Sequence, residues 1–381
     1  METENPLTAY SRILEDFDRE NRLRSIPGDR CDRPHIDMTS NDYLGLGKRW
    51  KSFMPEFLSR CQDASFSSSA SRLLSERQRH HLHLESLLSG LYNKDVLLFN
   101  SGYHANVGII QALAIPGTVF LCDKLIHASM IDGLALANAE YRRWRHNDTA
   151  SLRKLLEKYA DAPRCIVVVE SIYSMDGDIA PLAEIVELKK EFPQMLLYLD
   201  EAHAFGTRGE RGLGVAEELG LIDDVDILIG TLGKAAASSG AFVATSLLLK
   251  QFFINASRSL IFSTAIPPVN AAWSELMTIE ITGMAAERKH LAEISERFRK
   301  AVEEITGIPN NSRSHIVPLI VGDAEKSVRL AAHLSLKGVE ALPIRRPTVP
   351  EGGERLRFSL SADMSDSQVD YVIDAVKNSF E

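Results

Sequence analysis

The sequence lacks the features that mark several broad classes of protein. It has only four cysteines, Cys31, Cys61, Cys122 and Cys165, which lie far apart without metal-ligand spacing. They therefore indicate reduced, mostly buried thiols rather than a disulfide framework or a zinc site. No block of lysine and arginine is present, and the net charge is -9. We expect no nucleic-acid partner, because a phosphate backbone requires a basic face.

Long apolar runs are also missing. No stretch reaches the length needed to cross a bilayer, and the start METENPLTAY has no basic residues followed by an apolar run. We therefore expect a cytoplasmic protein without membrane insertion. His80, His81 and His83 are not spaced to place three imidazoles on one helix face. We expect them to be surface residues, and we expect no metal ion.

The chain is long enough and apolar enough to form a large and a smaller domain. It has 381 residues, of which 45% are hydrophobic. We expect an N-terminal arm over residues 1–44, a large domain over 45–270 and a small C-terminal domain over 271–381. No repeat or low-complexity linker separates these parts, so they should form one compact unit.

The most informative segment runs from residue 196 to residue 242. Two short apolar runs, 195–199 and 225–229, are typical of strands buried on both faces of a parallel sheet. The first ends at Asp200-Glu201-Ala202-His203 and the second at Gly230-Thr231-Leu232-Gly233-Lys234. Ligands of such sheets bind beyond the carboxyl ends of the strands, so both ends can face one pocket.

A carboxylate, an imidazole and a lysine at one site indicate pyridoxal 5'-phosphate (PLP) as the cofactor. Lys234 would form a Schiff base with the aldehyde, and Asp200 would pair with the pyridine nitrogen and keep it protonated. Partial desolvation would lower the pKa of the amine toward its reactive neutral form. Each residue alone has a simpler explanation, since Lys234 could be a solvated loop residue and Asp200 a helix N-cap.

Two other strand ends carry candidate cofactor contacts. The run 96–99 leads to Gly102 and Tyr103, where unpaired amides at a helix N-terminus can bind a phosphate, although such a turn is often only a cap. The run 119–122 leads to His127, which without context would be a core histidine.

Taken together and in order, these motifs resemble the alpha-oxoamine synthases, a branch of the fold type I PLP enzymes. The resemblance runs from about residue 41 to the C-terminus. The motifs are Ser40-Asn41-Asp42-Tyr43-Leu44-Gly45-Leu46, Asn100-Ser101-Gly102-Tyr103, His127-Ala128-Ser129, Ser174-Met175-Asp176-Gly177-Asp178, Asp200-Glu201-Ala202-His203, Thr231-Leu232-Gly233-Lys234 and Arg355-Leu356-Arg357-Phe358-Ser359-Leu360-Ser361. The resemblance implies an α/β fold in which a large domain with a mainly parallel seven-stranded sheet is joined by a smaller α/β C-terminal domain and an N-terminal helical arm.

The resemblance also implies roles around the cofactor. His127 would stack on the pyridine ring and fix its plane. Ser174 and His203 would bond the phenolic oxygen, Thr231 would bind the phosphate, and His203 would also polarise the thioester carbonyl. Lys234, once displaced by the amino acid, would remove the alpha proton.

Other implied residues concern the substrates and the subunits. Arg357 matches a carboxylate-binding arginine, whereas Arg355 could be an ordinary surface charge. The implied substrate-binding residues are Asn41, Arg357, Ser359 and, by a looser match, Arg24. Ser263 or Thr264 would reach the phosphate of the neighbouring subunit, which implies a homodimer with shared active sites.

The chain departs from the family between residues 65 and 78. Serines stand in place of a glycine-rich run, and Glu76-Arg77-Gln78 stands in place of Gly-Asn-His. The resemblance therefore does not define the backbone shape or a CoA contact here.

Three segments, 146–148, 319–323 and 344–350, look like the family members that join L-alanine to a pimeloyl thioester in biotin synthesis. The acyl carrier, CoA or acyl carrier protein, stays open, and a free pimeloyl carboxylate would need a basic partner such as Arg24 or Arg345. The rivals join glycine to an acetyl or succinyl thioester, or serine to a fatty acyl thioester. A non-catalytic partner subunit is a further alternative, which the presence of Lys234 and Asp200 disfavours.

Overall fold

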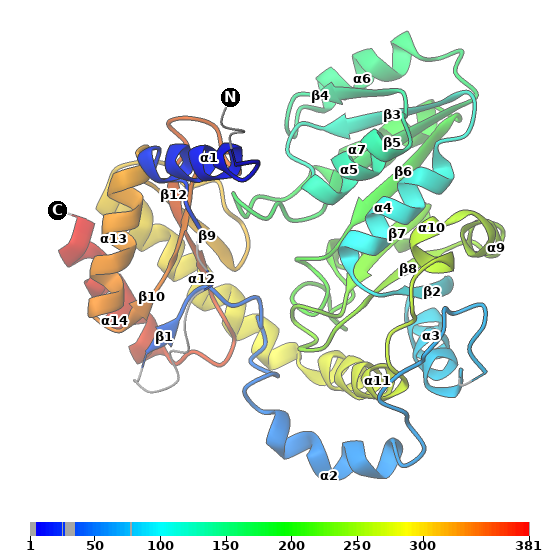
Figure 1. Ribbon diagram of the computed structural model, residues 1–381, viewed down its shortest axis with the longest axis horizontal. Coiled ribbons are helices and arrows are strands. Elements are labelled where there is room, and N and C mark those ends of the chain that lie inside the picture. Colours follow the sequence, from blue (N-terminus) through cyan, green and yellow to red (C-terminus); the bar gives the residue numbers. More distant parts are fainter. Residues whose placement is uncertain (1–4, 25, 27–34, 77, 381) are drawn as a thin grey trace.

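The computed structural model describes residues 5–24, 26, 35–76 and 78–380, and it shows a large and a small unit side by side (Figure 1). Cys31 and Arg77 lie outside the described residues. Within the described part, no helix combines the length and the apolar character needed to cross a membrane.

A seven-stranded sheet in the order β2-β8-β7-β6-β5-β3-β4 forms the centre of the large unit. The strands are β2 (Asp95–Phe99), β3 (Thr118–Asp123), β4 (Tyr141–Trp144), β5 (Arg164–Glu170), β6 (Met195–Asp200), β7 (Ile227–Thr231) and β8 (Ala241–Thr245). Strand β8 runs antiparallel to both of its neighbours, β2 and β7, and the other adjacent pairs are parallel. The predicted α/β fold with a mainly parallel seven-stranded sheet is confirmed.

Helices cover both faces of this sheet. Its strands are unbroken apolar runs in the sequence because both of their faces are buried. On one face α4 (Gly102–Leu113) packs against α5 (Ala128–Leu136), and on the other α3 (Arg79–Tyr92) packs against α11 (Pro268–Gly283). Alternate residues of β2 divide between two apolar cores, with Val96 in one and Leu97 in the other. The remaining helices of this unit are α2 (Trp50–Arg60), α6 (Thr149–Lys158), α7 (Leu182–Glu191), α8 (Val215–Glu218), η1 (Ile222–Asp224), α9 (Leu247–Ala256) and α10 (Arg258–Ile261).

Two of the three α3 histidines are not on the surface as predicted. His83 is exposed, but His80 and His81 are buried, and His81 Nε2 lies 2.8 Å from Ile266 O. The serine-rich loop before α3 attaches to the same segment, because Ala265 N donates to Ala70 O at 3.0 Å. His81 therefore packs α3 against the chain that leads into α11, whereas His80 Nε2 lies 3.2 Å from Asp63 Oδ1.

The small unit combines two short sheets with three helices. Strands β9 (Ile316–Ile320), β12 (Arg355–Ser359) and β11 (Leu342–Ile344) are antiparallel in the order β11-β12-β9. Strand β1 (Ile36–Asp37) pairs in parallel with β10 (Val339–Glu340). The helices are α12 (Ala285–Thr306), α13 (Ala324–Leu336) and α14 (Asp366–Phe380).

The contacts of the helices indicate where one unit gives way to the other. Helix α11 packs on α2 and α3, whereas α12 packs on α14 and β9, so we place the boundary near Met284. The N-terminal helix α1 (Thr8–Arg19) belongs to the arm, whose Asn21 O accepts a hydrogen bond from Arg345 at 2.6 Å. Figure 1 shows the arm on the side of the small unit.

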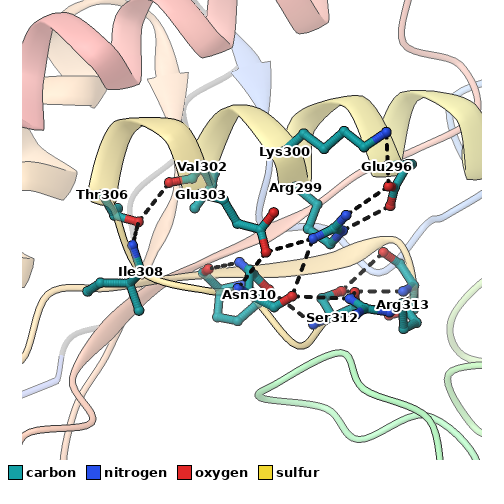
Figure 2. Close-up of polar contacts among 12 residues, drawn as sticks. Glu296, Arg299, Lys300, Val302, Glu303, Thr306, Ile308, Asn310, Ser312 and Arg313 are labelled. Atoms are coloured by element: carbon teal, nitrogen blue, oxygen red, sulfur yellow. Dashed lines mark hydrogen bonds and ion pairs between the residues drawn. The ribbon is translucent and has the colours of Figure 1, made fainter.

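The small unit docks on the loop that follows β5. Beyond α12 the chain is fastened to the helix by side chains (Figure 2), among them Glu303, whose Oε1 accepts from Asn310 N at 2.8 Å. Arg313 N and Ser314 Oγ then donate to Gly177 O at 3.0 and 2.8 Å. The same loop carries Ser174, so this contact brings β12 close to a predicted cofactor residue.

Gly177 should be sensitive to substitution, because it has a φ of +68° and an added Cβ would lie 1.9 Å from Ile316 O. We expect Gly177→Ala to lower the free energy of unfolding by about 3 kcal/mol, through left-handed strain and a displaced contact between the units. Urea denaturation measures this change.

Gly90→Ala is the matched control, since an added Cβ there meets nothing within 4 Å and the position lies in α3. It should stabilise the protein by about 0.5–1 kcal/mol through the better helix propensity of alanine. Equal stability of the two variants would contradict the proposed tight contact at Gly177.

Candidate active site

The carboxyl ends of three central strands form the floor of the site. Glu170, the last residue of β5, pairs in register with Asp200, the last residue of β6. Strand β7 ends at Thr231 beside them, three residues before Lys234. This is the edge of a parallel sheet at which ligands bind.

Lys234 is the first member of a chain of hydrogen bonds. Its Nζ lies 2.9 Å from His203 Nε2, and His203 Nδ1 lies 2.7 Å from the Tyr43 hydroxyl oxygen. The Tyr43 hydroxyl in turn lies 2.8 Å from Asn41 Oδ1. A neutral imidazole has one N-H, so a consistent assignment has Lys234 donating to Nε2, Nδ1-H donating to Tyr43, and Tyr43 donating to Asn41.

The surroundings of these hydrogen-bonded side chains favour the neutral forms of His203 and Lys234. Burial lowers the pKa of His203 well below its ordinary value, and the positive charges of Lys234 and Arg357 lower it further. Burial likewise lowers the pKa of Lys234 to about 8, against the opposing effect of the Asp200 carboxylate. An amine that loses its proton near pH 8 is suited to attack a carbonyl group.

Asp200 is buried and oriented by two hydrogen bonds. Its Oδ1 accepts from Ala202 N at 2.9 Å, and its Oδ2 accepts from Asn106 Nδ2 at 2.9 Å. The Asn106 side chain is itself held, because its Oδ1 accepts from the Tyr198 hydroxyl at 2.7 Å. Asn106, from the middle of α4, therefore fixes the carboxylate on which the cofactor prediction depends.

His127 is connected to the same network through Ser129. It forms the N-cap of α5, its Nδ1 accepts from Ser129 N at 3.2 Å, and the Ser129 hydroxyl lies 2.8 Å from the same nitrogen. Ser129 Oγ also accepts from Asn106 Nδ2 at 3.0 Å. With Nδ1 accepting, the single proton of a neutral ring lies on Nε2.

The start of α4 and the end of β7 lie close together, as expected for a phosphate site. A Cβ added to Gly102 would be 3.9 Å from Thr231 Oγ1. The first amides of a helix have no partner within the helix and attract anions. The Tyr103 side chain is engaged elsewhere, because its hydroxyl donates to Asp132 Oδ2 at 2.6 Å.

Ser263 and Thr264 lie beside this segment in the same chain. Asn100 Nδ2 donates to Ser263 Oγ at 3.0 Å and to Thr264 O at 2.6 Å. Both residues therefore contact Asn100, which precedes Gly102 by two positions.

Arg357 lies where the two units meet. Its Nε donates to Ser174 O at 2.7 Å, its NH1 donates to Ser359 Oγ at 2.7 Å, and its NH2 lies 3.3 Å from Asn41 Oδ1. Ser359 thus orients the guanidinium, and Ser174 contacts it through the backbone carbonyl. Arg355 is buried and pairs with Asp176 at 2.5 Å, so it is not the surface charge that the sequence allowed.

Arg24 is not part of this cluster. Its NH2 donates to Thr348 Oγ1 at 3.1 Å, and Arg24, Arg345 and Thr348 line a separate cleft of about 1010 Å³ between the arm and the small unit. Within the described residues, no carboxylate is paired with either arginine.

Glu170 is a site residue that the sequence reasoning missed. Glu170 is buried, and this burial together with the Asp200 charge raises its pKa well above the ordinary value. Its Oε1 has no hydrogen-bond partner among the described residues. Tyr43 and Asn106 were also missed as functional residues. Tyr43 lies inside the motif Ser40–Leu46, of which only Asn41 was expected to bind the substrate, whereas no pattern in the sequence distinguishes Asn106.

The residues present fit PLP. The cofactor needs an amine, a carboxylate for the pyridine nitrogen and amide donors for the phosphate. Lys234, Asp200 and the Gly102 end of α4 supply these groups at one sheet edge. Glu170, one of whose oxygens has no partner among the described residues, ends the strand next to Asp200.

Comparisons with known proteins agree with this chemistry. The family model for aminotransferase class I and II matches residues 33–376. The 8-amino-7-oxononanoate synthase of Haemophilus ducreyi is 44% identical over 353 residues, which cover 90% of each chain. The serine palmitoyltransferase of Sphingomonas wittichii superposes with a TM-score of 0.90 at 28% identity, over 98% of each chain. A serine palmitoyltransferase structure that contains PLP superposes with a TM-score of 0.90 at 25% identity, over 99% of this chain and 98% of the other.

Lys234 should be essential for cofactor capture. We expect Lys234→Ala to lose the visible absorbance that a lysine-bound PLP gives, and nearly all turnover, while it keeps the thermal stability of the parent protein to within a few degrees. Absorbance spectra and thermal unfolding measure both. Lys250→Ala, on α9, is the control. Labelling of a lysine other than Lys234 after borohydride reduction would contradict the assignment.

The capture rate should also depend on pH. Because the pKa of Lys234 is lowered to about 8, the reactive neutral amine becomes the major form above that pH. Stopped-flow mixing of cofactor-free protein with PLP should show a rate that rises through about pH 8 and then levels off. A rise delayed to pH 10 would contradict the lowered pKa.

Proposed function

Because this chain belongs to the aminotransferase class I and II family, and within it to the alpha-oxoamine synthases, we propose that it joins L-alanine to a pimeloyl thioester. It is a PLP-dependent acyltransferase of the biotin-pathway type. The proposed reaction releases carbon dioxide and a free thiol and yields 8-amino-7-oxononanoate. The observation that carries the proposal is the hydrogen-bonded chain from Lys234 through His203 and Tyr43 to Asn41, which ends against Arg357.

The bound cofactor supplies an electron-withdrawing ring next to the alpha carbon of the amino acid. Asp200 would hold the pyridine nitrogen in its protonated form, and its two hydrogen bonds keep the carboxylate in place without reorganisation. His127 would bind against the ring, and Gly102 and Thr231 would hold the phosphate.

Lys234 is the base that moves the alpha proton. Its pKa of about 8 lies close to neutral pH, so the amine can take a proton and return it. His203 accepts a hydrogen bond from the amine and keeps it on one side of the site. Since His203 is neutral, its Nδ1-H donates to Tyr43, and the orientation of the ring follows from that contact.

Arg357 binds the carboxylate of the amino acid. Its guanidinium is buried and already oriented by Ser174 O and Ser359 Oγ, which leaves NH2 toward Asn41. A carboxylate that enters here gains charge-assisted hydrogen bonds from a preformed donor. We propose that Asn41 shares this site and contacts the same substrate.

The rival family reactions are less well supported. Serine palmitoyltransferases share the fold at 25–28% identity, whereas the 8-amino-7-oxononanoate synthase of H. ducreyi is 44% identical. Discrimination of alanine from glycine depends on one methyl group, worth about 1–3 kcal/mol, so glycine should be a weak substrate. A non-catalytic partner subunit would not need the buried Lys234 and Asp200.

We also propose a homodimer with shared active sites. The loops around the phosphate site expose large apolar side chains, with Phe66 86% and Phe262 72% accessible. These lie near Ser263 and Thr264, the residues that we expect to reach the partner's cofactor. Burial of such side chains in an interface would remove apolar surface from water.

A substrate panel tests the proposed reaction. Purified protein with PLP is given alanine, glycine or serine together with acetyl-, succinyl-, pimeloyl- or palmitoyl-CoA, or pimeloyl-acyl carrier protein, and products are identified by mass. We expect alanine with a pimeloyl thioester to give the highest kcat/KM, and glycine with the same thioester to be about 10- to 200-fold lower. Faster turnover of serine with palmitoyl-CoA, or of glycine with acetyl-CoA, would contradict the proposal and leave the family unchanged.

A further inference from the structure

His146 is held by carboxylates on both sides of its ring. Its Nδ1 lies 2.8 Å from Asp123 Oδ1, and its Nε2 lies 2.7 Å from Asp178 Oδ2. The ring also packs edge-on against Tyr173, with centroids 4.5 Å apart. None of the contacts described for the active site involves this histidine.

The two contacts indicate a charged ring. Both nitrogens face carboxylate oxygens, so both act as donors only when the imidazole is protonated. Burial would lower the pKa of His146, but the hydrogen bonds and charges of Asp123 and Asp178 outweigh burial and raise it to about 10. At neutral pH the cluster is therefore one positive charge between two negative charges.

We call His146 with its two carboxylates, Asp123 and Asp178, the clamp. Asp123 connects the clamp to His127, the residue expected to stack on the cofactor. It is the last residue of β3, and its Oδ1 also accepts from Leu125 N at 2.8 Å, which shapes the turn into His127. Its Oδ2 accepts from Asn147 N at 3.0 Å. Asp123 has no accessible side-chain surface, so its position is set entirely by these neighbours.

Asp178 connects the clamp to the carboxylate-binding arginine. It closes the loop after β5, where Tyr173 N donates to Asp178 O at 3.1 Å. Asn147 Nδ2 donates to Asp178 Oδ2 at 2.9 Å and fastens the loop a second time. The same loop presents Ser174 O to Arg357 Nε.

We propose that His146 is a positioning residue that sets the distance between His127, on the cofactor side, and Arg357, on the amino-acid side. The inference rests on the proposed function through the roles of Arg357 and His127. It predicts that loss of His146 weakens binding of the amino acid much more than capture of PLP. The loop of Asp178 carries the Ser174 carbonyl that orients Arg357, whereas, among the described residues, Lys234, Asp200 and Gly102 make no hydrogen bond with His146, Asp123 or Asp178.

The physical reason is the charge that removal of the ring leaves behind. Asp123 and Asp178 would then face one another without a counter-charge, and like charges in a partly buried site repel. Asp123 is the more buried carboxylate, so the loop with Asp178 is the part that moves. Its shift takes Ser174 O away from Arg357.

Spectral titration separates the proposal from a purely structural role. We expect His146→Gln to raise the dissociation constant of L-alanine, read from the shift of the PLP absorbance band, by tenfold or more. The dissociation constant of PLP should stay within about threefold of that of the parent protein.

The double variant His146→Gln/Asp178→Asn removes the repulsion between the two carboxylates and should recover at least part of the alanine affinity. His290→Gln, on α12 with its ring bonded to Met364 O, is the control and should change neither constant.

Asn147→Gly is the second variant, in case His146→Gln does not fold. This variant keeps the charged ring of His146 and the backbone N-H that donates to Asp123. Glycine tolerates the φ of 52° at position 147, and the side-chain contact to Asp178 is lost. It should weaken alanine binding in the same direction by a smaller factor. An unchanged alanine constant in either folded variant would overturn the proposal, as would equal losses for alanine and PLP. Failure of the parent protein to join alanine to a pimeloyl thioester would instead count against the proposed reaction alone.

Discussion

The hydrogen bond between the Lys234 amine and the neutral ring of His203 is the interaction on which the site depends. A free lysine at a strand end would be protonated and solvated, and it would not be a nucleophile at neutral pH. Burial removes that solvation and lowers its pKa to about 8, and the orientation of His203 by Tyr43 gives the amine a single direction. The sheet edge, the small residues after β7 and the Tyr43 turn all serve this placement.

The second requirement is a fixed distance between the Lys234 amine and Arg357, the residue proposed to bind the substrate carboxylate, and the two units provide it jointly. Arg357 belongs to β12 of the small unit, yet it donates to Ser174 O in the large unit. Gly177, in the same loop as Ser174, accepts a hydrogen bond at its carbonyl oxygen from Arg313 N of the small unit. The loop after β5 therefore carries both the docking of the small unit and the orientation of its arginine.

Much of this arrangement could be predicted from residues near strand ends. Asp200, His203 and Lys234 follow unbroken apolar runs, and the carboxyl ends of parallel strands must meet at one edge. The positions that were missed depend on tertiary contacts without a local signal. Asn106 is an ordinary polar residue in a helix until Asp200 is brought beside it. The burial of His81 and Arg355 similarly follows from partners distant in the sequence.

Asp200, Lys234 and the cofactor should act together on the alpha proton of an amino acid. Exchange of the alpha hydrogen of L-alanine in deuterated water, followed by NMR without any thioester, measures this joint action. With equal PLP occupancy, Asp200→Asn should slow exchange by about a thousandfold, near the 4 kcal/mol that one preorganised charge can supply. Exchange at the parent rate in that variant would contradict the proposed role of Asp200.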